Sequence, residues 1–436
     1  MLTKIHIENF KSLKNIDVPC CGLNLLTGVN GAGKSSFIQV LRLLHLSAEK
    51  INELDQEINV KDFGAGTGLN DVRYSYGSIS SKILISASYI DGVHEFEIVR
   101  TLEEFMGIGR RPGTVRFAHP SYFSTRNRVY DRAENLQIDY FEGTEGVTEA
   151  SVQEAFKEAD KVFDKEVKRI HDEEHDKIVV IKTTWEGARF IDAFRRKPTD
   201  ISEGGRYDVA SFMFVFPGCD YIKTFNPEGQ DVMEFLYKYN RYSKKSQVIE
   251  KVNQCLNWVS PGARLSIDEK QVGERYYYVS AVDYGVDDDT RMFKPQNVGF
   301  GVSYILPVLA TLLTAEKGNI LIIENPEAHL HPRGQAEIGK LIAETVSRGV
   351  QVFIETHSDH VINGIRVAVK KSVLKPSDVN IAFFERKEHD VVDDEGKETR
   401  EIFTTVRDIK VDENGSLSEY PEDFMDEWNN QLMRLM

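Results

Sequence analysis

The chain has 436 residues, of which 41% are apolar and 28% are charged, a composition typical of a globular protein with more than one domain. The formal net charge of −15 excludes a protein that coats nucleic acid with its whole surface, so contact with DNA or RNA must be local. Two short basic clusters, at 195–197 and 238–245, are predicted to be solvated surface.

No apolar run approaches the roughly 20 residues that are needed to cross a bilayer. The N-terminus begins with an alternating strand pattern and shows no secretory leader. We therefore predict a cytoplasmic protein with no membrane partner. No metal-binding or disulfide spacing relates the four cysteines, so they are predicted to be small core residues: Cys20, Cys21, Cys219 and Cys255.

The strongest local pattern is a phosphate-binding loop near the start of the chain. The stretch "GLNLLTGVNGAGKSSFIQVLRLL" predicts a strand, then Gly28-x4-Gly33-Lys34-Ser35, and then a helix with apolar periodicity. Glycines let successive backbone N–H groups and the helix N-terminus face the phosphates of a nucleotide. We therefore predict that Lys34 contacts the β- and γ-phosphates of ATP and that the Ser35 hydroxyl is a ligand of Mg²⁺.

The pattern changes in the middle of the chain, between about residues 72 and 289. Residues 72–102 alternate with period two, which predicts antiparallel strands. Apolar residues at helical spacing in 148–171 predict an amphipathic helix that packs within this region. The charge run at 386–401, farther along the chain, is predicted to be a solvated hairpin.

A second group of motifs lies between residues 295 and 360. A turn with Gly299 and Gly301 opens a long apolar helix, and its exposed N–H groups are suited to an anion. The buried strand that follows ends in "ENPEAHLHP", and a helix from Pro332 leads to another strand that ends in "ETHSDH". The order is therefore a loop and helix, an acid-ended strand, a helix, and a further strand.

With these motifs the sequence resembles the ABC-type ATPase heads of the SMC and RecF class. The likeness rests on "IHIENFKSLKNIDV", the phosphate loop, "ENPEAHLHP" and "ETHSDH". It is strongest to the overcoming-lysogenization-defect group and to ATPase subunits of anti-phage systems such as Septu and PARIS. The resemblance implies an α/β fold: an ABC-type P-loop head from 1–71 and 290–385, an inserted mixed α+β lobe at 72–289, and a tail segment of the head at 386–436.

The resemblance also implies roles for single residues. Glu324 matches the Walker B acid and offers a carboxylate to Mg²⁺ or its water shell, and His357 matches the histidine that senses the γ-phosphate. Residues 328–331 fall where the D-loop belongs. The Walker A motif corresponds to 28–36, with nucleotide-binding roles for Gly28, Asn30, Gly31, Gly33, Lys34, Ser35 and Ser36.

The turn at 299–303, which we call the signature-like turn, falls where the ABC signature motif belongs. Its Gly299, Gly301 and Ser303 would cover ATP that is bound to another copy, so the resemblance implies at least a homodimer. Gly299 stands where the motif normally supplies a serine hydroxyl, so backbone N–H groups would have to replace it.

The catalytic position departs most from the family pattern. Asn325 stands where a glutamate is usual, and an amide cannot accept the proton of the attacking water. Glu327 is either a substitute base or a residue that caps the helix at Pro332 or pairs across the dimer. Because a general base adds about 10²–10⁴-fold, slow ATP hydrolysis is predicted. Gln56 is a candidate Q-loop residue, and Arg126 faces phosphate or forms a structural ion pair.

Three classes of function fit such a head. The first is a dimerising ATPase that regulates a separate effector, such as a nuclease or toxin, in bacterial anti-phage defence. The second is a DNA-repair or chromosome-associated ATPase that binds DNA itself. The third, a self-contained nuclease, requires a TOPRIM-like arrangement of acids that the residues after His357 do not offer. The acidic balance and the lack of a long coiled coil favour the first.

Overall fold

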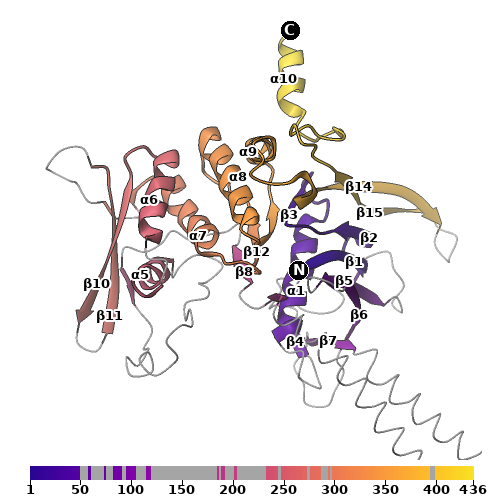
Figure 1. Cartoon of the computed structure of the whole chain (residues 1–436). Coiled ribbons are helices and arrows are strands. Elements are labelled where there is room, and N and C mark those ends of the chain that lie inside the picture. Colours follow the sequence, from indigo (N-terminus) through magenta and orange to yellow (C-terminus); the bar gives the residue numbers. More distant parts are fainter. Residues whose placement is uncertain are drawn as a thin grey trace, which may run out of the picture. The chain divides into compact units, whose positions relative to one another are not determined.

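A computed structural model of the chain covers the motifs of both ends and part of the middle region (Figure 1). The residues it describes are 1–49, 57–59, 73–74, 82–90, 95–104, 114–118, 184–185, 188–191, 201–203, 232–243, 247–272, 275–285, 293–294, 297–392 and 398–436. Five predicted features lie outside these residues: the helix at 148–171, the basic cluster at 195–197, Cys219, Gln56 and Arg126.

The chain forms two compact units. Unit 1 comprises Met1–Asp17, Ser36–Trp185 and His389–Phe403. Unit 2 comprises Val18–Ser35, Glu186–Glu388 and Thr404–Met436. These units describe packing, and the predicted division of the chain at residues 72, 289 and 385 stays a prediction.

Unit 1 contains a six-stranded sheet in the order β2-β1-β5-β6-β7-β4. Its middle strand β5 pairs antiparallel with β1 and β6, and β7 pairs antiparallel with β6 and β4. The predicted antiparallel strands within residues 72–102 are therefore confirmed. The strands are β1 (Leu2–Phe10), β2 (Leu13–Pro19), β4 (Glu57–Asn59), β5 (Ile83–Ile90), β6 (Glu95–Glu104) and β7 (Thr114–Ala118).

Unit 2 is built on a second six-stranded sheet, in the order β15-β14-β3-β13-β12-β8. From β14 to β8 each strand runs parallel to its neighbour. Every residue of β3 and β13 is buried, which is why these central strands are near-continuous apolar runs. The strands are β3 (Leu23–Gly28), β8 (Arg189–Ile191), β12 (Ile320–Glu324), β13 (Gln351–Glu355), β14 (Val379–Val392) and β15 (Glu398–Ile409).

The helices of the described residues mostly follow the predicted pattern, with a short 3-10 turn at Pro376–Asp378. The helix α8 begins at Pro332, where the fixed φ of proline suits the first helical position, and α9 begins after Ser358, whose hydroxyl accepts from the Val361 N–H. The helices are α1 (Lys34–Glu49), α5 (Val232–Tyr242), α6 (Val248–Val259), α7 (Phe300–Thr314), α8 (Pro332–Ser347), α9 (Asp359–Lys370) and α10 (Glu427–Leu435).

Part of the predicted inserted lobe packs in the core of unit 2. A three-stranded sheet, in the order β10-β11-β9, has the bounds Arg264–Val272, Arg275–Asp283 and Ile201–Glu203. Buried residues of α5, α6 and β10 join those of α7, α8 and the parallel sheet in one apolar cluster. The helices α5 and α6 and the strand β10 thus support the same core that carries the acid-ended strands.

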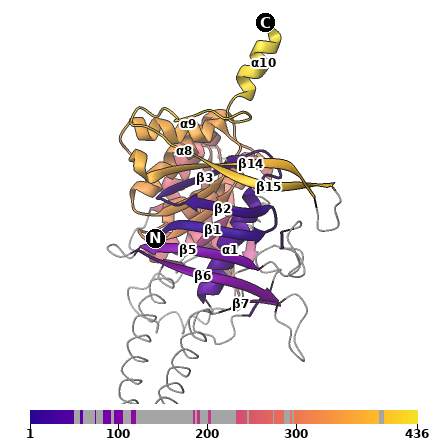
Figure 2. The ribbon, with the colours of Figure 1, turned by 90° about the vertical axis from the view of Figure 1, so that its right-hand side faces the viewer.

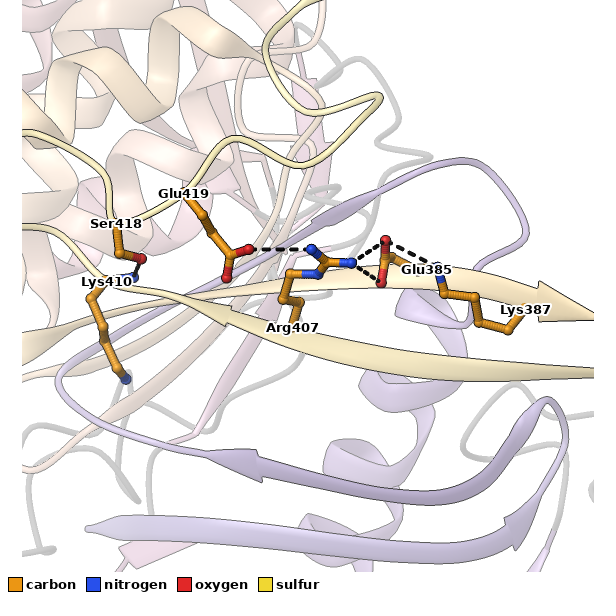
Figure 3. A network of polar contacts seen from close by, with 6 residues as sticks. All are labelled: Glu385, Lys387, Arg407, Lys410, Ser418 and Glu419. Carbon is orange, nitrogen blue, oxygen red and sulfur yellow. Dashed lines mark hydrogen bonds and ion pairs between the residues drawn. The ribbon is translucent and has the colours of Figure 1, made fainter.

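The C-terminal segment is fixed to β14 and β15 by ion pairs. Arg407 of β15 donates to both carboxylate oxygens of Glu385 at 3.1 Å and to Glu419 at 3.2 Å (Figure 3). The Lys410 N–H also donates to the Ser418 hydroxyl at 2.9 Å. β14 and β15 run side by side along most of their length (Figures 1 and 2).

The charge run at 386–401 is only partly the solvated hairpin that the sequence predicts. Residues 386–390 are exposed, but Glu401 is 4% exposed. Within unit 1 its carboxylate accepts from Lys14 at 2.7 Å and from the Tyr74 hydroxyl at 2.8 Å, and it pairs with His389. This acid is therefore a buried structural group.

Two simpler predictions concern cysteines and membranes. The described cysteines are free, and burial raises the pKa of Cys21 and of Cys255 to about 12, so both thiols stay protonated near neutral pH. Within the described residues, no helix has both the length and the apolarity required to cross a membrane.

Two glycines allow α8 and α9 to touch backbone to backbone. A Cβ on Gly364 would lie 2.2 Å from the Ala336 carbonyl oxygen, and one on Gly339 would lie 2.3 Å from the Val361 carbonyl oxygen. Because the clashing atoms are backbone, they cannot move aside as a side chain could.

Gly364→Ala is expected to destabilise the protein by about 3 kcal/mol, the upper end of the usual cost of overpacking. Gly334→Ala in α8 is the matched control, since an added Cβ there meets only side-chain carbons at 3.7 Å or more, and its effect should stay within about 1 kcal/mol. Urea denaturation followed by circular dichroism measures both. Equal stability of the two variants would show that the helices are not packed this closely.

Candidate functional site

The phosphate-binding loop connects β3 to α1, as the sequence predicts. Gly28, Gly31 and Gly33 have φ angles of +130°, +77° and +103°, in the left-handed region that favours glycine. The Lys34 ammonium lies over this loop and donates to the carbonyl oxygens of Gly28 and Val29, both at 2.9 Å. Ser35 is exposed at the start of the helix.

Residues from the end of the chain support this loop. The Thr404 hydroxyl, which is buried, donates to the Ala32 carbonyl oxygen at 2.9 Å. A Cβ on Gly28 would lie 2.1 Å from the Phe384 carbonyl oxygen, so β14 approaches the loop too closely for any other residue at that position. The sequence patterns did not reveal this support, because the partners lie more than 350 residues apart.

Two acid-ended strands lie beside the loop. β13 is the neighbour of β3 and β12 is the neighbour of β13, and the two strands pair so that Glu324 is level with Glu355. The Thr356 N–H donates to the Leu26 carbonyl oxygen of β3 at 3.2 Å, which extends the parallel register to the end of the strand. Two carboxylates therefore stand at the same edge of the sheet as the phosphate loop.

Sequence reasoning missed Glu355 as a site residue. Its side-chain oxygens lie 3.4 and 3.5 Å from the Ser35 hydroxyl, which donates toward both. Burial raises the pKa of Glu355, while the charge of Lys34 and the Ser35 hydrogen bond act in the opposite direction. The signal was present, because "VFIE" is an apolar run that ends in an acid, as "LIIE" does at Glu324.

Asn325 occupies a backbone conformation that explains its residue type. Its φ of +45° is in the left-handed region, where asparagine is enriched several-fold over most residues. Its N–H donates to the Glu355 carbonyl oxygen at 2.8 Å, which holds the turn against the end of β13. A glutamate at this position would adopt the same conformation only with strain.

Glu327 does not cap α8, so that interpretation of the sequence is wrong. The N-cap is His331, whose ring nitrogen accepts from the Arg333 N–H at 3.3 Å. Glu327 instead accepts a hydrogen bond from the His357 N–H at 3.1 Å. The loop after β12 is thereby tied to the loop after β13.

His357 and its neighbours form the second half of this connection. Burial and the charge of Lys34 lower the pKa of His357. The Ser358 hydroxyl donates to Gln335 at 2.6 Å, and Gln335 donates to the Leu330 carbonyl oxygen at 2.8 Å. Glu327 and Gln335 thus join the loop after β12 to the loop after β13 at two different points.

The signature-like turn lies at the start of α7. Gly299 is its N-cap and is exposed, and Gly301 lies close to the loop after β12, where a Cβ would meet the His329 carbonyl oxygen at 2.8 Å. Ser303 is 0% exposed and belongs to the buried side of the helix, so its predicted role in nucleotide binding stays a prediction that the surface of this turn does not support. Backbone N–H groups near Gly299 are the accessible polar groups of this turn.

Comparison with known proteins decides the family. A family model described as "AAA domain, putative AbiEii toxin, Type IV TA system" matches residues 23–363, well over half of the chain. The chain belongs to this family. Its α/β P-loop ATPase fold agrees with the strand order and phosphate loop described above, and the predicted fold class is confirmed. A further family, "Protein of unknown function (DUF3696)", matches residues 374–435, which include β14, β15 and the ion-paired tail.

Individual relatives are more distant. The DNA replication and repair protein RecF of Nitrosococcus oceani is 44% identical over 46 residues, which are 10% of this chain and only 13% of that relative's length. An SMC head bound to the C-winged helix domain of ScpA is 12% identical with a TM-score of 0.44, covering 94% of this chain and 97% of that one. The SMC head with an extended coiled coil from Pyrococcus furiosus is 11% identical with a TM-score of 0.44. That likeness covers 100% of this chain and 99% of the SMC head. The family assignment does not depend on these structural likenesses.

The oxygen atoms of this AAA domain suit the Mg²⁺ that P-loop ATPases use. A serine hydroxyl and carboxylates are the hard ligands that Mg²⁺ prefers, and Ser35 and Glu355 are already adjacent. No group of three or more histidine, cysteine or acidic residues among the described residues could hold a metal ion by itself. A cation at this site would therefore depend on the phosphate oxygens of a nucleotide.

Proposed function

We propose that this AAA domain binds ATP with Mg²⁺, hydrolyses it slowly, and in its ATP-bound dimer regulates a separate effector protein. The observation that carries the proposal is the placement of Lys34 and Ser35 beside two acid-ended parallel strands. Membership of the family supports an ATPase, and the remaining steps are argued from the residues of the site.

The roles of the phosphate loop follow from its contacts. The ammonium of Lys34 would exchange the Gly28 and Val29 carbonyl oxygens for β- and γ-phosphate oxygens, which are stronger acceptors because they are charged. The N–H groups of Asn30, Gly31 and Gly33, with those of Ser35 and Ser36 at the helix N-terminus, would surround the phosphates. Ser35 and Glu324 would hold Mg²⁺, which neutralises the phosphate charge that develops during transfer.

Slow hydrolysis follows from the groups around Asn325. An amide orients water but does not remove its proton, so the reaction would rely on positioning and on charge stabilisation. Glu327 is the nearest candidate for a substitute base, but it already accepts from the His357 N–H. In this proposal Glu327 mainly positions His357, the residue that would sense the γ-phosphate.

Regulation of an effector is favoured over direct binding of DNA. The family description names a putative toxin of a type IV toxin–antitoxin system, and in this proposal the toxic or nucleolytic step belongs to a separate partner of the ATPase. The net charge of −15 disfavours an extended DNA-binding surface. The alternative, a RecF-like repair ATPase that binds DNA, has support from one relative over 46 residues.

Lys34→Ala is expected to weaken ATP binding by about 100-fold or more, since the variant loses at least two hydrogen bonds between charged groups. Isothermal titration calorimetry with Mg²⁺ present measures the affinity. Lys375→Ala, at an exposed lysine far along the chain, is the control and should bind as the unaltered protein does. Equal affinity of Lys34→Ala and the control would refute the assignment of the loop.

Turnover by the unaltered protein should fall well below about 10 s⁻¹, the usual enzyme median. Asn325→Glu should raise single-turnover hydrolysis by about 10²-fold by supplying a base, while the strained backbone costs about 1 kcal/mol of stability. Asn325→Gly, which tolerates the positive φ, should keep the stability without the gain in rate. Glu327→Gln should lower the rate if that carboxylate is the base. Fast turnover that none of these changes alters would place the chemistry elsewhere.

The dimer is tested separately. The N–H groups near Gly299 would cover ATP that is bound to a second copy, so a non-hydrolysable ATP analogue should convert monomer to dimer or stabilise an existing dimer. Multi-angle light scattering with and without the analogue measures the mass. A strict monomer of 49.7 kDa under both conditions would contradict the proposed assembly.

A further inference from the structure

We propose that Glu355, rather than Glu324 alone, is the carboxylate that holds the water shell of nucleotide-bound Mg²⁺ beside Ser35. This inference rests on the proposed function, because it assumes that Mg²⁺ and ATP bind at the phosphate loop. It assigns a role to a residue outside the motif positions at which the sequence places the site.

The order of the strands places Glu355 closer to the phosphate loop than Glu324. β13 lies directly beside β3, and β12 lies one strand farther away. Because neighbouring strands are about 4.8 Å apart, Glu355 at the end of β13 stands one strand spacing closer to the β3 edge than Glu324 does. Because Glu324 pairs with Glu355, the two acids lie at the same height along the strands. They differ only in their distance from β3 across the sheet.

The Ser35 hydroxyl is directed toward the Glu355 carboxylate. Its oxygen is 3.4 Å from one carboxylate oxygen of Glu355 and 3.5 Å from the other. Both separations exceed the roughly 2.7–2.8 Å of a well-formed O–H···O bond. The hydroxyl therefore faces the carboxylate but forms only a weak hydrogen bond with either oxygen. Both groups are thus available to the same cation and its waters.

Burial makes the charge of the Glu355 carboxylate energetically costly. Glu355 is 7% exposed, and a buried charge is unfavourable unless it is paired. Its electrostatic partner within unit 2 is Lys34, which the proposed function directs to the phosphates. A divalent cation would supply the compensating charge when Lys34 turns to the nucleotide. The cation would thus replace Lys34 as the charged partner of Glu355 when ATP binds.

The test compares nucleotide affinity with and without Mg²⁺, using a non-hydrolysable ATP analogue in calorimetry. In Glu355→Gln the gain in affinity on adding Mg²⁺ should fall by about tenfold relative to the unaltered protein. Affinity without Mg²⁺ should be equal or higher, because a negative charge near the phosphates has been removed. Glu324→Gln should lose less of the affinity that Mg²⁺ adds. The control is Glu344→Gln, at an exposed acid of α8, which should lose none of it.

Binding of Mn²⁺, followed by electron paramagnetic resonance in the presence of the same analogue, gives a readout that does not depend on turnover. Ser35→Ala combined with Glu355→Gln should cost less than the sum of the two single losses, because both residues act on one cation. Should Glu355→Gln fail to fold, Glu355→Asp keeps the charge with a shorter reach and should show an intermediate gain from Mg²⁺.

The outcomes separate the two claims. If the unaltered protein does not bind the nucleotide, the proposed function fails and this inference fails with it. This inference is overturned if Mg²⁺ raises the nucleotide affinity of Glu355→Gln as much as that of the unaltered protein but no longer raises that of Glu324→Gln. The proposed function would then remain intact. Equal losses with and without Mg²⁺ in Glu355→Gln also overturn it, since the residue would then act only on the shape of the loop.

Discussion

The parallel register of β3, β13 and β12 is the constraint on which the site depends. Because parallel strands end at the same edge, this register places the phosphate loop, Glu355 and Glu324 in one row. The Asn325 and Thr356 N–H groups continue the pairing past the last residue of each strand, so the acids are held by backbone bonds on both sides. A slip of one residue would turn both carboxylates to the other face of the sheet.

This register also brings the two loops beyond the strands close enough to be joined by hydrogen bonds. Glu327 accepts from the backbone of His357, and Gln335 connects Ser358 to the Leu330 carbonyl oxygen. A shift of His357 toward or away from a γ-phosphate would therefore move the loop that follows β12. That loop also lies close to the signature-like turn of the same chain, since a Cβ on Gly301 would meet the His329 carbonyl oxygen at 2.8 Å. Under the proposed function, such a connection would provide a physical route from ATP to an effector.

Much of the fold could be predicted from the sequence because its signals are local. The phosphate loop, the apolar strands and the helix that begins at Pro332 each follow from periodicity and from the properties of glycine and proline over short stretches. Other features could not be predicted, because each depends on partners far away in the chain. They are the burial of Ser303 and of Glu401, the contact of Thr404 with the loop, and the role of Glu355. Ser35 and Glu355, for example, are 320 residues apart. Asn325 could be predicted in part. The sequence shows that its residue type departs from the family pattern, but it does not show the positive φ.

The central claim is that Ser35 and Glu355 form the cation side of an ATP site. A crystal structure of the protein with Mg²⁺ and a non-hydrolysable ATP analogue tests it most directly. The account predicts a cation at the Ser35 hydroxyl and the phosphates, with a water of its shell on the Glu355 carboxylate. A nucleotide at the loop whose cation is held only from the Glu324 side, with Glu355 turned away, would contradict it.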